Sequence, residues 1–149
     1  FFTLLFAQAV GADGMVYAAD IVPEMLQLVR ERAEEKKLTN IHTVLCADDS
    51  SKLPPGKVDL TFICATYHHF EYPNSTLATI HEAMKPGSEL VVIDMKRIKG
   101  QSSDWAMKHM RAGQEGFTKE IEAAGFELID DGSSVDYLKD SYMIRFRRK

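Results

Sequence analysis

The chain has 149 residues, of which 45% are hydrophobic, enough to build the core of one domain. Its 27% of charged residues excludes a disordered tail, and its apolar runs are shorter than a bilayer span. The short apolar runs therefore predict no membrane role. The net charge of −4 gives no basic field, so no nucleic-acid-binding role is predicted either. Cys46 and Cys64 are too few for a disulfide scaffold and indicate reduced thiols of a cytoplasmic protein.

The first half alternates between predicted helices and buried strands. Residues 1–10 are apolar on nearly all sides, which favours a buried helix, and a short strand is predicted over 15–20. Pro23 suits the first turn of the next helix. Further strands are expected over 40–46 and 58–65. The latter is apolar almost throughout, as in a parallel sheet that is covered on both faces.

The second half continues this alternation. Pro73 begins another predicted helix, which ends at Lys85-Pro86-Gly87, and a buried strand follows over 90–94. The polar stretch 96–113 is expected to contain a short helix around Trp105. A helix and strand therefore alternate along most of the chain, which is typical of βαβ units with parallel strands.

The C-terminal end departs from this pattern. A last helix, carrying Phe117 and Ile121, is predicted to end at Gly125, and strands follow over 126–130 and 142–146. The 11-residue link between these two strands is too short for a helical crossover, so they should pair antiparallel. The predicted fold is α/β, a Rossmann-like, doubly wound, mostly parallel sheet with an antiparallel C-terminal strand.

Ligands of doubly wound sheets bind beyond the carboxyl ends of the strands, so the residues after each strand are candidates. Asp20 follows the first strand, where a carboxylate can accept hydrogen bonds from both ribose hydroxyls of a nucleoside cofactor. The alternative is a solvated acid near a helix start. Asp48 and Asp49 follow the second strand, where a carboxylate can meet an adenine amino group or simply form a turn.

The third strand is followed by small and then aromatic residues, Ala65-Thr66-Tyr67-His68-His69-Phe70. Such a segment can line a cofactor wall and a substrate mouth. His68 or His69 can act as a general base near neutral pH, or one can pack on the sheet while the other caps a loop. Adjacent histidines also suggest metal, but no third ligand has a convincing spacing, so no metal site is predicted.

Four segments carry a resemblance when they are taken in order along the chain. They are Val16-Tyr17-Ala18-Ala19-Asp20-Ile21 with Pro23-Glu24-Met25, Val58-Asp59-Leu60-Thr61-Phe62, Met84-Lys85-Pro86-Gly87-Ser88-Glu89-Leu90-Val91-Val92-Ile93-Asp94, and Ile121-Glu122-Ala123-Ala124-Gly125-Phe126. This set resembles class I S-adenosylmethionine-dependent methyltransferases of the small-molecule branch, over nearly the whole chain. The antiparallel terminal strand is also what that family has and what NAD-binding Rossmann folds usually lack.

The resemblance also predicts an N-terminally truncated chain, a single but partial methyltransferase-like domain over 1–149. The family's first strand and glycine-rich loop should precede Phe1, and residues 1–10 resemble the helix that follows that loop. In the family's strand order, 3-2-1-4-5-7-6, the absent strand lies between those that end at Asp20 and Ala65. We therefore expect impaired methyl transfer, with the two open edges paired to each other or filled by a second copy in a homodimer.

Each candidate residue receives a role from the resemblance, with S-adenosylmethionine as the cofactor. The implied cofactor contacts are Asp20 to the ribose, Ile21 and Met25 to the adenine, Asp48 or Asp49 to its amino group, and Ala65 and Thr66 along the methionine arm. The implied surroundings of a small-molecule substrate are Tyr67, His68, His69, Lys96, Arg97, Trp105, His109 and Arg111. Most of the basic residues have a simpler interpretation as solvated surface.

Two other functions remain open from the sequence. A non-catalytic Rossmann-like module that uses the fold for association is favoured by the absent loop. An NAD-dependent enzyme is disfavoured by the terminal hairpin and by the Tyr-His-His-Phe segment. Binding of S-adenosylmethionine, of NAD or of neither distinguishes the three.

Overall fold

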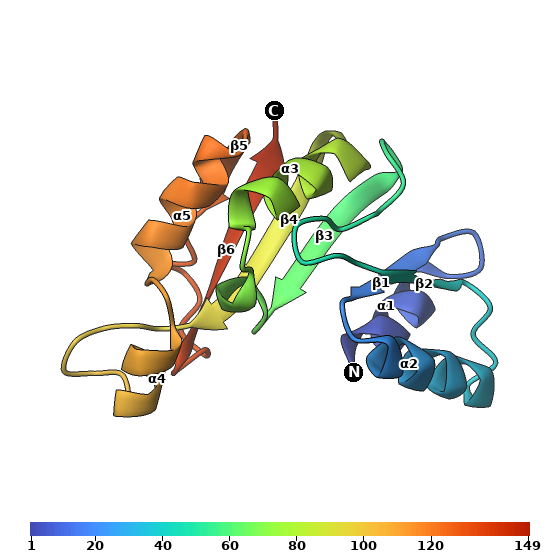
Figure 1. Ribbon diagram of the computed structural model, residues 1–149, viewed down its shortest axis with the longest axis horizontal. Coiled ribbons are helices and arrows are strands. Elements are labelled where there is room, and N and C mark those ends of the chain that lie inside the picture. The colour runs from blue at the N-terminus through green and yellow to red at the C-terminus, as the bar shows by residue number, and fades with distance from the viewer. The chain divides into compact units, whose positions relative to one another are not determined.

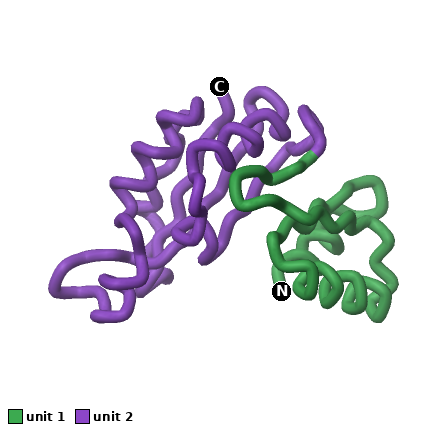
Figure 2. The backbone as a smooth tube through the Cα atoms, in the orientation of Figure 1, with its two compact units in different colours: residues 1–53 green, residues 54–149 purple.

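The computed structural model describes residues 1–149 as two compact units, residues 1–53 (unit 1) and residues 54–149 (unit 2), which Figure 2 colours separately. Each unit has its own sheet (Figure 1). The expectation of one domain over 1–149 stays a prediction. No helix has both the length and the apolar character that crossing a bilayer requires.

Unit 1 contains two helices and a two-stranded parallel sheet. In chain order these are α1 (Phe2–Val10), β1 (Val16–Asp20), α2 (Pro23–Glu35) and β2 (Ile41–Leu45). Strands β1 and β2 pair in parallel from Val16 opposite Ile41 to Asp20 opposite Leu45. All four predicted elements are confirmed, including Pro23 at the start of α2, where its missing N–H breaks no helical hydrogen bond.

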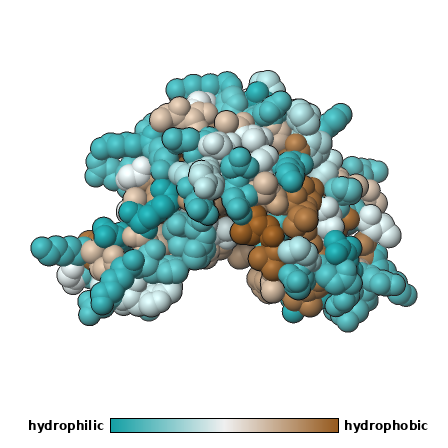
Figure 3. Space-filling view, in the orientation of Figure 1, coloured by the Kyte–Doolittle hydropathy of each residue, from teal (hydrophilic) through white to brown (hydrophobic).

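The burial predicted for α1 is wrong. Of its residues only Ala7 is buried, while Phe2, Leu5 and Val10 are 40–48% exposed. The helix packs on β1 and α2, but a two-stranded sheet and one further helix offer too little apolar surface to cover every side of it. Figure 3 accordingly shows hydrophobic side chains gathered over unit 1 near the N-terminus.

Unit 2 is built on a four-stranded sheet in the order β3-β4-β6-β5. Its strands are β3 (Val58–Cys64), β4 (Met84–Met95), β5 (Phe126–Asp130) and β6 (Ser141–Arg148). Strands β3 and β4 are parallel, whereas β6 runs antiparallel to both β4 and β5. The mixed sheet with an antiparallel C-terminal strand is confirmed.

The helices of unit 2 are α3 (Pro73–Ala83), α4 (Asp104–His109) and α5 (Gln114–Ala123), with a 3₁₀ turn, η1 (Tyr67–His69), after β3. The predicted boundary of α3 needs a correction. The helix ends at Ala83, because Met84 already pairs with Val58 and begins β4. The ladder resumes at Leu60 opposite Glu89, so the predicted Lys-Pro-Gly stop forms an irregularity within the strand.

The core of unit 2 lies where α3 and α5 pack against the sheet (Figure 1). Strand β6 alternates cleanly, with every second side chain buried from Tyr142 to Phe146, as expected for a strand that faces a core on one side. Side chains without exposed surface include residues of both helices and of three strands: Leu77, Phe117, Ile121, Leu90, Val92, Phe126, Ile144 and Phe146.

Each sheet has an unpaired edge at both ends, on β1 and β2 in unit 1 and on β3 and β5 in unit 2. Strand β1 pairs with β2 alone, and β3 pairs with β4 alone. The expectation that these two edges pair with each other or with a second copy stays a prediction, because β1 and β3 belong to different units. Both edges therefore present unpaired backbone N–H and C=O groups to an added strand.

Candidate functional site

The carboxylate of Asp20 stands at the carboxyl end of β1, as predicted. Its Oδ1 accepts a hydrogen bond from the backbone N–H of Val22 at 2.9 Å, which fixes the turn into α2. Its Oδ2 makes no hydrogen bond within the chain and is free to accept one from a ligand. Beside it, Ile21 and Met25 are 57% and 50% exposed. A free carboxylate oxygen next to bare apolar side chains suits a nucleoside, which has both hydroxyl donors and a flat base.

Asp48 and Asp49 lie in the exposed loop after β2. The loop is a tight turn, closed by a hydrogen bond from the Ala47 N–H to the Ser50 carbonyl at 2.9 Å. This is the turn-forming arrangement that the sequence offered as the alternative to adenine contact. Both carboxylates are nevertheless exposed at the carboxyl end of β2.

In unit 2, the chain turns sharply at the end of β3. Ala65 has a positive φ of 51°, a left-handed conformation that costs free energy for a residue with a Cβ. Its N–H still continues the ladder to the Ile93 carbonyl at 2.8 Å, and the Thr66 hydroxyl donates to the Cys64 carbonyl at 2.9 Å. These contacts hold η1 directly above the parallel carboxyl ends of β3 and β4, where ligands of such sheets bind.

The pair formed by His68 and Asp94 is almost completely buried, with 6% and 1% of the two residues exposed. The Nδ1 of His68 lies 2.7 Å from Asp94 Oδ1, and the His68 backbone N–H donates to Oδ2 at 3.1 Å. The Met95 N–H also donates to Oδ1, at 2.9 Å. A carboxylate against Nδ1 keeps the proton on that nitrogen, so Nε2 carries the lone pair.

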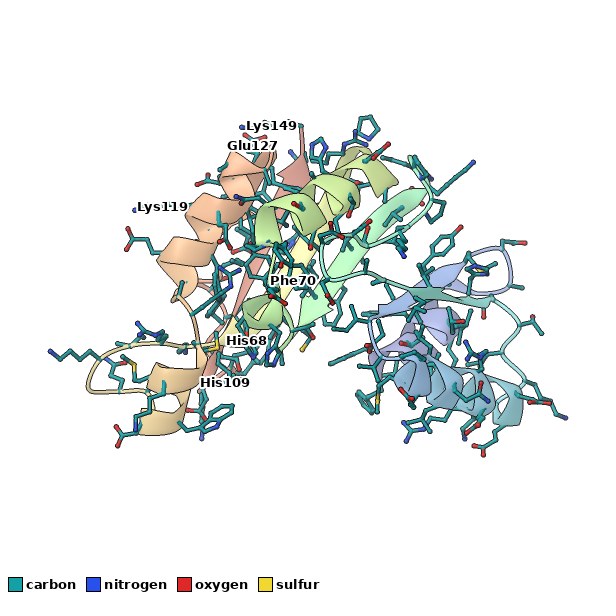
Figure 4. All side chains as sticks on the ribbon, in the orientation of Figure 1. His68, Phe70, His109, Lys119, Glu127 and Lys149 are labelled. Atoms are coloured by element: carbon teal, nitrogen blue, oxygen red, sulfur yellow. The ribbon has the colours of Figure 1, made fainter.

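A third histidine completes the cluster. His109, at the end of α4 and 41 positions after His68, places its Nε2 at 3.2 Å from His68 Nε2. The centre of the His69 ring lies 4.0 Å from the centre of the His68 ring and 5.0 Å from the centre of the His109 ring. Burial, followed by the neighbouring His68 and His109, lowers the pKa of His69 and favours its neutral form. Figure 4 shows His68 and His109 together at this end of unit 2.

Tyr67 and Arg111 both bind Glu120 of α5. Tyr67 has no exposed surface and donates to Glu120 at 2.6 Å. Arg111 binds the same carboxylate through two nitrogens, at 2.8 and 2.7 Å, and its cation lies 4.6 Å from the centre of the Phe117 ring. Burial opposes ionisation, but the hydrogen bonds from Arg111 and Tyr67 lower the pKa of Glu120. This network ties η1 to α5.

Two other predicted substrate residues, Lys96 and Trp105, differ in whether they are available to a ligand. Lys96 donates to the carbonyls of Leu138 and Lys139, at 2.9 and 3.0 Å. Trp105 is 59% exposed, and its ring stacks on that of His109 with centroids 4.4 Å apart and planes at 18°. Trp105 is therefore the residue of this group with an open face for a ligand, whereas the ammonium of Lys96 serves the chain itself.

Two acids of this candidate site, Asp94 and Glu120, are not among the residues predicted from the sequence. Asp94 ends the strand predicted over 90–94, and the rule that selected Asp20 could have selected it too. Glu120 carried no signal, because an acid on a helix is normally solvated. His109 was included among the substrate residues, but its approach to His68 and His69 depends on where α4 lies and not on spacing along the chain.

Known proteins resemble this chain in sequence and in fold. The profile of a family described as "Methyltransferase domain" matches residues 1–138. A ubiquinone/menaquinone biosynthesis C-methyltransferase, UbiE, of Burkholderia mallei is 26% identical over 96 residues, which is 64% of this chain. That match covers 39% of the relative, so the chain spans well under half the length of the curated relatives that it matches.

Solved structures match the chain over nearly all of its length. A SAM-dependent methyltransferase from Aquifex aeolicus has a TM-score of 0.83 at 22% identity, over 100% of this chain and 77% of that one. The [4+2]-cyclase SpnF has a TM-score of 0.76 at 15% identity, over 97% of this chain and 69% of that one. The second match illustrates that this fold supports more than one reaction.

Proposed function

Because the chain belongs to the methyltransferase domain family, we propose that it transfers a methyl group from S-adenosylmethionine to a small molecule. S-adenosylmethionine is the cofactor implied by the family and by the fold. The observation that carries the catalytic part of the proposal is the buried His68–Asp94 pair at the carboxyl ends of two parallel strands. A histidine held in that way is a general base with a fixed tautomer.

The residues at the end of β1 fit the nucleoside part of the cofactor. The free Oδ2 of Asp20 accepts hydrogen bonds from the ribose hydroxyls, and the exposed side chains of Ile21 and Met25 pack on adenine. The exposed Asp48 or Asp49 accepts a hydrogen bond from the adenine amino group. In unit 2, the resemblance assigns Ala65 and Thr66 to the methionine arm, and the strained backbone of Ala65 supports a functional role there.

When bound, S-adenosylmethionine supplies a methyl group activated by a sulfonium centre. The acceptor's nucleophilic atom would bond to that methyl carbon as the methyl–sulfur bond breaks, and the electron pair of the broken bond would stay on sulfur. His68 Nε2 takes the proton that the acceptor loses. Asp94 holds the imidazole in position and stabilises its protonated form, so it is a positioning residue and not a catalytic one.

The proposed acceptor is a planar, aromatic small molecule with a weakly acidic position. The exposed face of Trp105 supports this, because a flat ring can stack there beside the histidines. The name of the Burkholderia relative, which places it in ubiquinone and menaquinone biosynthesis, points to the same class of compound. Hydroquinones are therefore the first acceptors to test.

The test uses the full-length gene product and two variants. Calorimetry compares S-adenosylmethionine with NAD, and chromatography follows methylated product from a panel of hydroquinones and phenols. His68→Gln should lower the rate ~100- to 10,000-fold while cofactor affinity stays the same. His81→Gln, outside the cluster, is the matched control and should react normally. NAD binding would contradict the cofactor assignment, and an active His68→Gln enzyme would exclude His68 as the base.

The open edges of β1 and β3 favour a second candidate, a module that associates through added strands. For the same reason we propose that the 149 residues by themselves are impaired in methyl transfer, and that a second copy can fill the edges. Sedimentation and calorimetry on the 149-residue chain test both points. A monomer that binds S-adenosylmethionine with micromolar affinity would contradict them.

A further inference from the structure

Three of the five histidines of the chain converge in unit 2. His68 and His69 belong to η1 and His109 ends α4, and one ring nitrogen from each lies within 4.8 Å of the others. Imidazole nitrogens suit zinc, copper, iron and nickel, whereas magnesium and calcium require oxygen ligands. We propose that His68, His69 and His109 bind one divalent transition-metal ion of the zinc class.

The distances within the cluster fit such an ion. Zinc–nitrogen bonds of 2.0–2.1 Å in a tetrahedral site separate two ligand nitrogens by about 3.3 Å. The Nε2 atoms of His68 and His109 are 3.2 Å apart, so these two ligands already have the required separation. His69 is exposed, and a rotation that moves its ring nitrogen inward by up to about 1.5 Å completes the set.

Asp94 provides a second, independent observation. Histidines that bind metal usually donate their other N–H to a carboxylate, which fixes the tautomer and the ring orientation. His68 Nδ1 has this partner in Asp94, which is 1% exposed and is itself held by two backbone N–H groups. The lone pair of His68 Nε2 is therefore directed toward His109 without any rearrangement of the fold.

The site goes beyond the proposed function and does not rest on it. Three histidines leave a fourth position for water or for an oxygen atom of a ligand. A metal ion on His68 Nε2 uses the lone pair that the proposed methyl transfer uses to accept a proton. Metal binding and proton acceptance at His68 therefore exclude each other, and zinc should inhibit methyl transfer.

The experiment measures metal binding directly, on the metal-free full-length protein. Co²⁺ is titrated while its visible absorption is recorded, because a four-coordinate nitrogen site gives an intense band. The fluorescence of Trp105, the single tryptophan of these 149 residues, should be quenched in parallel, since its ring stacks on His109. We expect one Co²⁺ per chain, displaced by Zn²⁺, and no response to Mg²⁺.

Five variants decide the outcome. His109→Gln and His69→Gln each remove an exposed ligand and should weaken Co²⁺ binding by more than ~10- to 100-fold, which is the loss expected when only a carboxylate that holds a ligand is removed. Asp94→Asn should cause a loss within that range. The matched controls His42→Gln and His81→Gln lie outside the cluster and should bind as the wild type.

Two results would overturn the proposal. One is wild-type affinity in His109→Gln and His69→Gln, and the other is no Co²⁺ binding by the wild type at millimolar concentration. The exposed ligand variants keep the test decisive even where Asp94→Asn does not fold. Because the assay requires no methyl transfer, failure of the proposed reaction leaves the metal-binding result unaffected, and the reverse also holds.

Discussion

The two units differ most in how completely they bury their apolar side chains. Unit 2 encloses large residues such as Leu90, Phe117 and Phe146 without any exposed surface, whereas three of the four buried hydrophobic residues of unit 1 are alanines. A four-stranded sheet covered by helices can support a core of its own, but two strands are marginal in water. Unit 1 thus requires apolar cover that its own residues do not supply, and unit 2 does not.

Three acidic side chains of the two units differ in how many of their carboxylate oxygens are hydrogen-bonded within the chain. In unit 2, Asp94 and Glu120 use both carboxylate oxygens on groups of the same unit. In unit 1, Asp20 binds one backbone N–H and leaves its other oxygen free. A carboxylate that is fully engaged positions its neighbours, while one that is half engaged at a strand end is available to a ligand. The comparison therefore makes Asp94 and Glu120 candidate positioning acids and Asp20 the candidate binding acid.

The largest expected effect comes from a matched pair of leucine truncations. Leu90→Ala, in β4 with no exposed surface, should lower the free energy of unfolding by ~2–5 kcal/mol, because it leaves a cavity. Leu28→Ala, in α2 with 37% of the residue exposed, should cost less than about 1 kcal/mol. Urea titration followed by circular dichroism measures both. Equal losses would mean that the contrast in burial does not reflect a contrast in stability.

The next largest effect concerns binding in unit 1. Asp20→Ala in the full-length protein should weaken S-adenosylmethionine binding by ~1.5–3 kcal/mol, the range for hydrogen bonds to a charged group. Asp13→Ala removes an exposed acid of the same unit and should leave the affinity unchanged. Calorimetry compares the two variants with the wild type. Unchanged affinity in Asp20→Ala would remove this carboxylate from the binding site.

Local patterns predicted the elements of both units but not the burial of α1. Apolar periodicity and the prolines at positions 23 and 73 located the helices, because these signals lie within one turn of chain. The burial of residues 1–10 was overestimated because composition says nothing of what surrounds a helix. The sequence also placed Asp20 correctly at the end of its strand, since a strand end is itself a local feature.

The histidine cluster lay beyond local reasoning for a different physical reason. His68 and His109 are separated by 41 positions and meet because β3, β4 and α4 fold onto the same edge of unit 2. No spacing rule encodes that approach. The same holds for Tyr67 and Arg111, whose predicted substrate roles came from their residue types, while their contact with Glu120 depends on the tertiary fold.

A smaller effect is expected in the pH dependence of stability, through the pair of Glu120 and Arg111 in unit 2. The folded pKa of Glu120 lies below its usual 4.5, so its pair with Arg111 stabilises the fold above about pH 4.5 and is lost as the pH falls through the lower, folded pKa. Glu120→Gln should cost about 1 kcal/mol at pH 7, since solvent partly screens the pair. The variant should also lose less unfolding free energy than the wild type as the pH is lowered.

The control for this prediction is Glu115→Gln on the same helix. Glu115 pairs with Lys119 one turn away, and both side chains are largely exposed. Its replacement should leave the unfolding free energy at pH 7 unchanged within error. Urea titrations at pH 7 and at pH 3 supply the measurement. A Glu120→Gln variant that keeps the full pH dependence of the wild type would show that other carboxylates produce it.

The smallest expected effect concerns buried polar groups of unit 2 that form no hydrogen bond. Four buried side-chain atoms lack a hydrogen-bond partner, in Thr61, Ser88, Tyr142 and Arg148. All four lie in unit 2, because deep burial is what deprives a polar atom of water. The Tyr142 hydroxyl belongs to a residue that pairs with Asp94 across β4 and β6, and burial followed by Asp94 raises the pKa of this phenol.

The Tyr142→Phe variant tests whether the Tyr142 hydroxyl merely lacks a hydrogen-bond partner or contacts a ligand. An unpaired buried hydroxyl costs free energy, so its removal should stabilise the fold by a few tenths to about 1 kcal/mol in urea titration. Tyr17→Phe in unit 1 is the control, because that ring is only half-buried and should show no gain. A loss of stability in Tyr142→Phe would reveal a hydrogen-bond partner. Unchanged stability together with weaker binding of a methyl acceptor would instead place this hydroxyl beside His68 and Asp94 as a group that contacts the ligand.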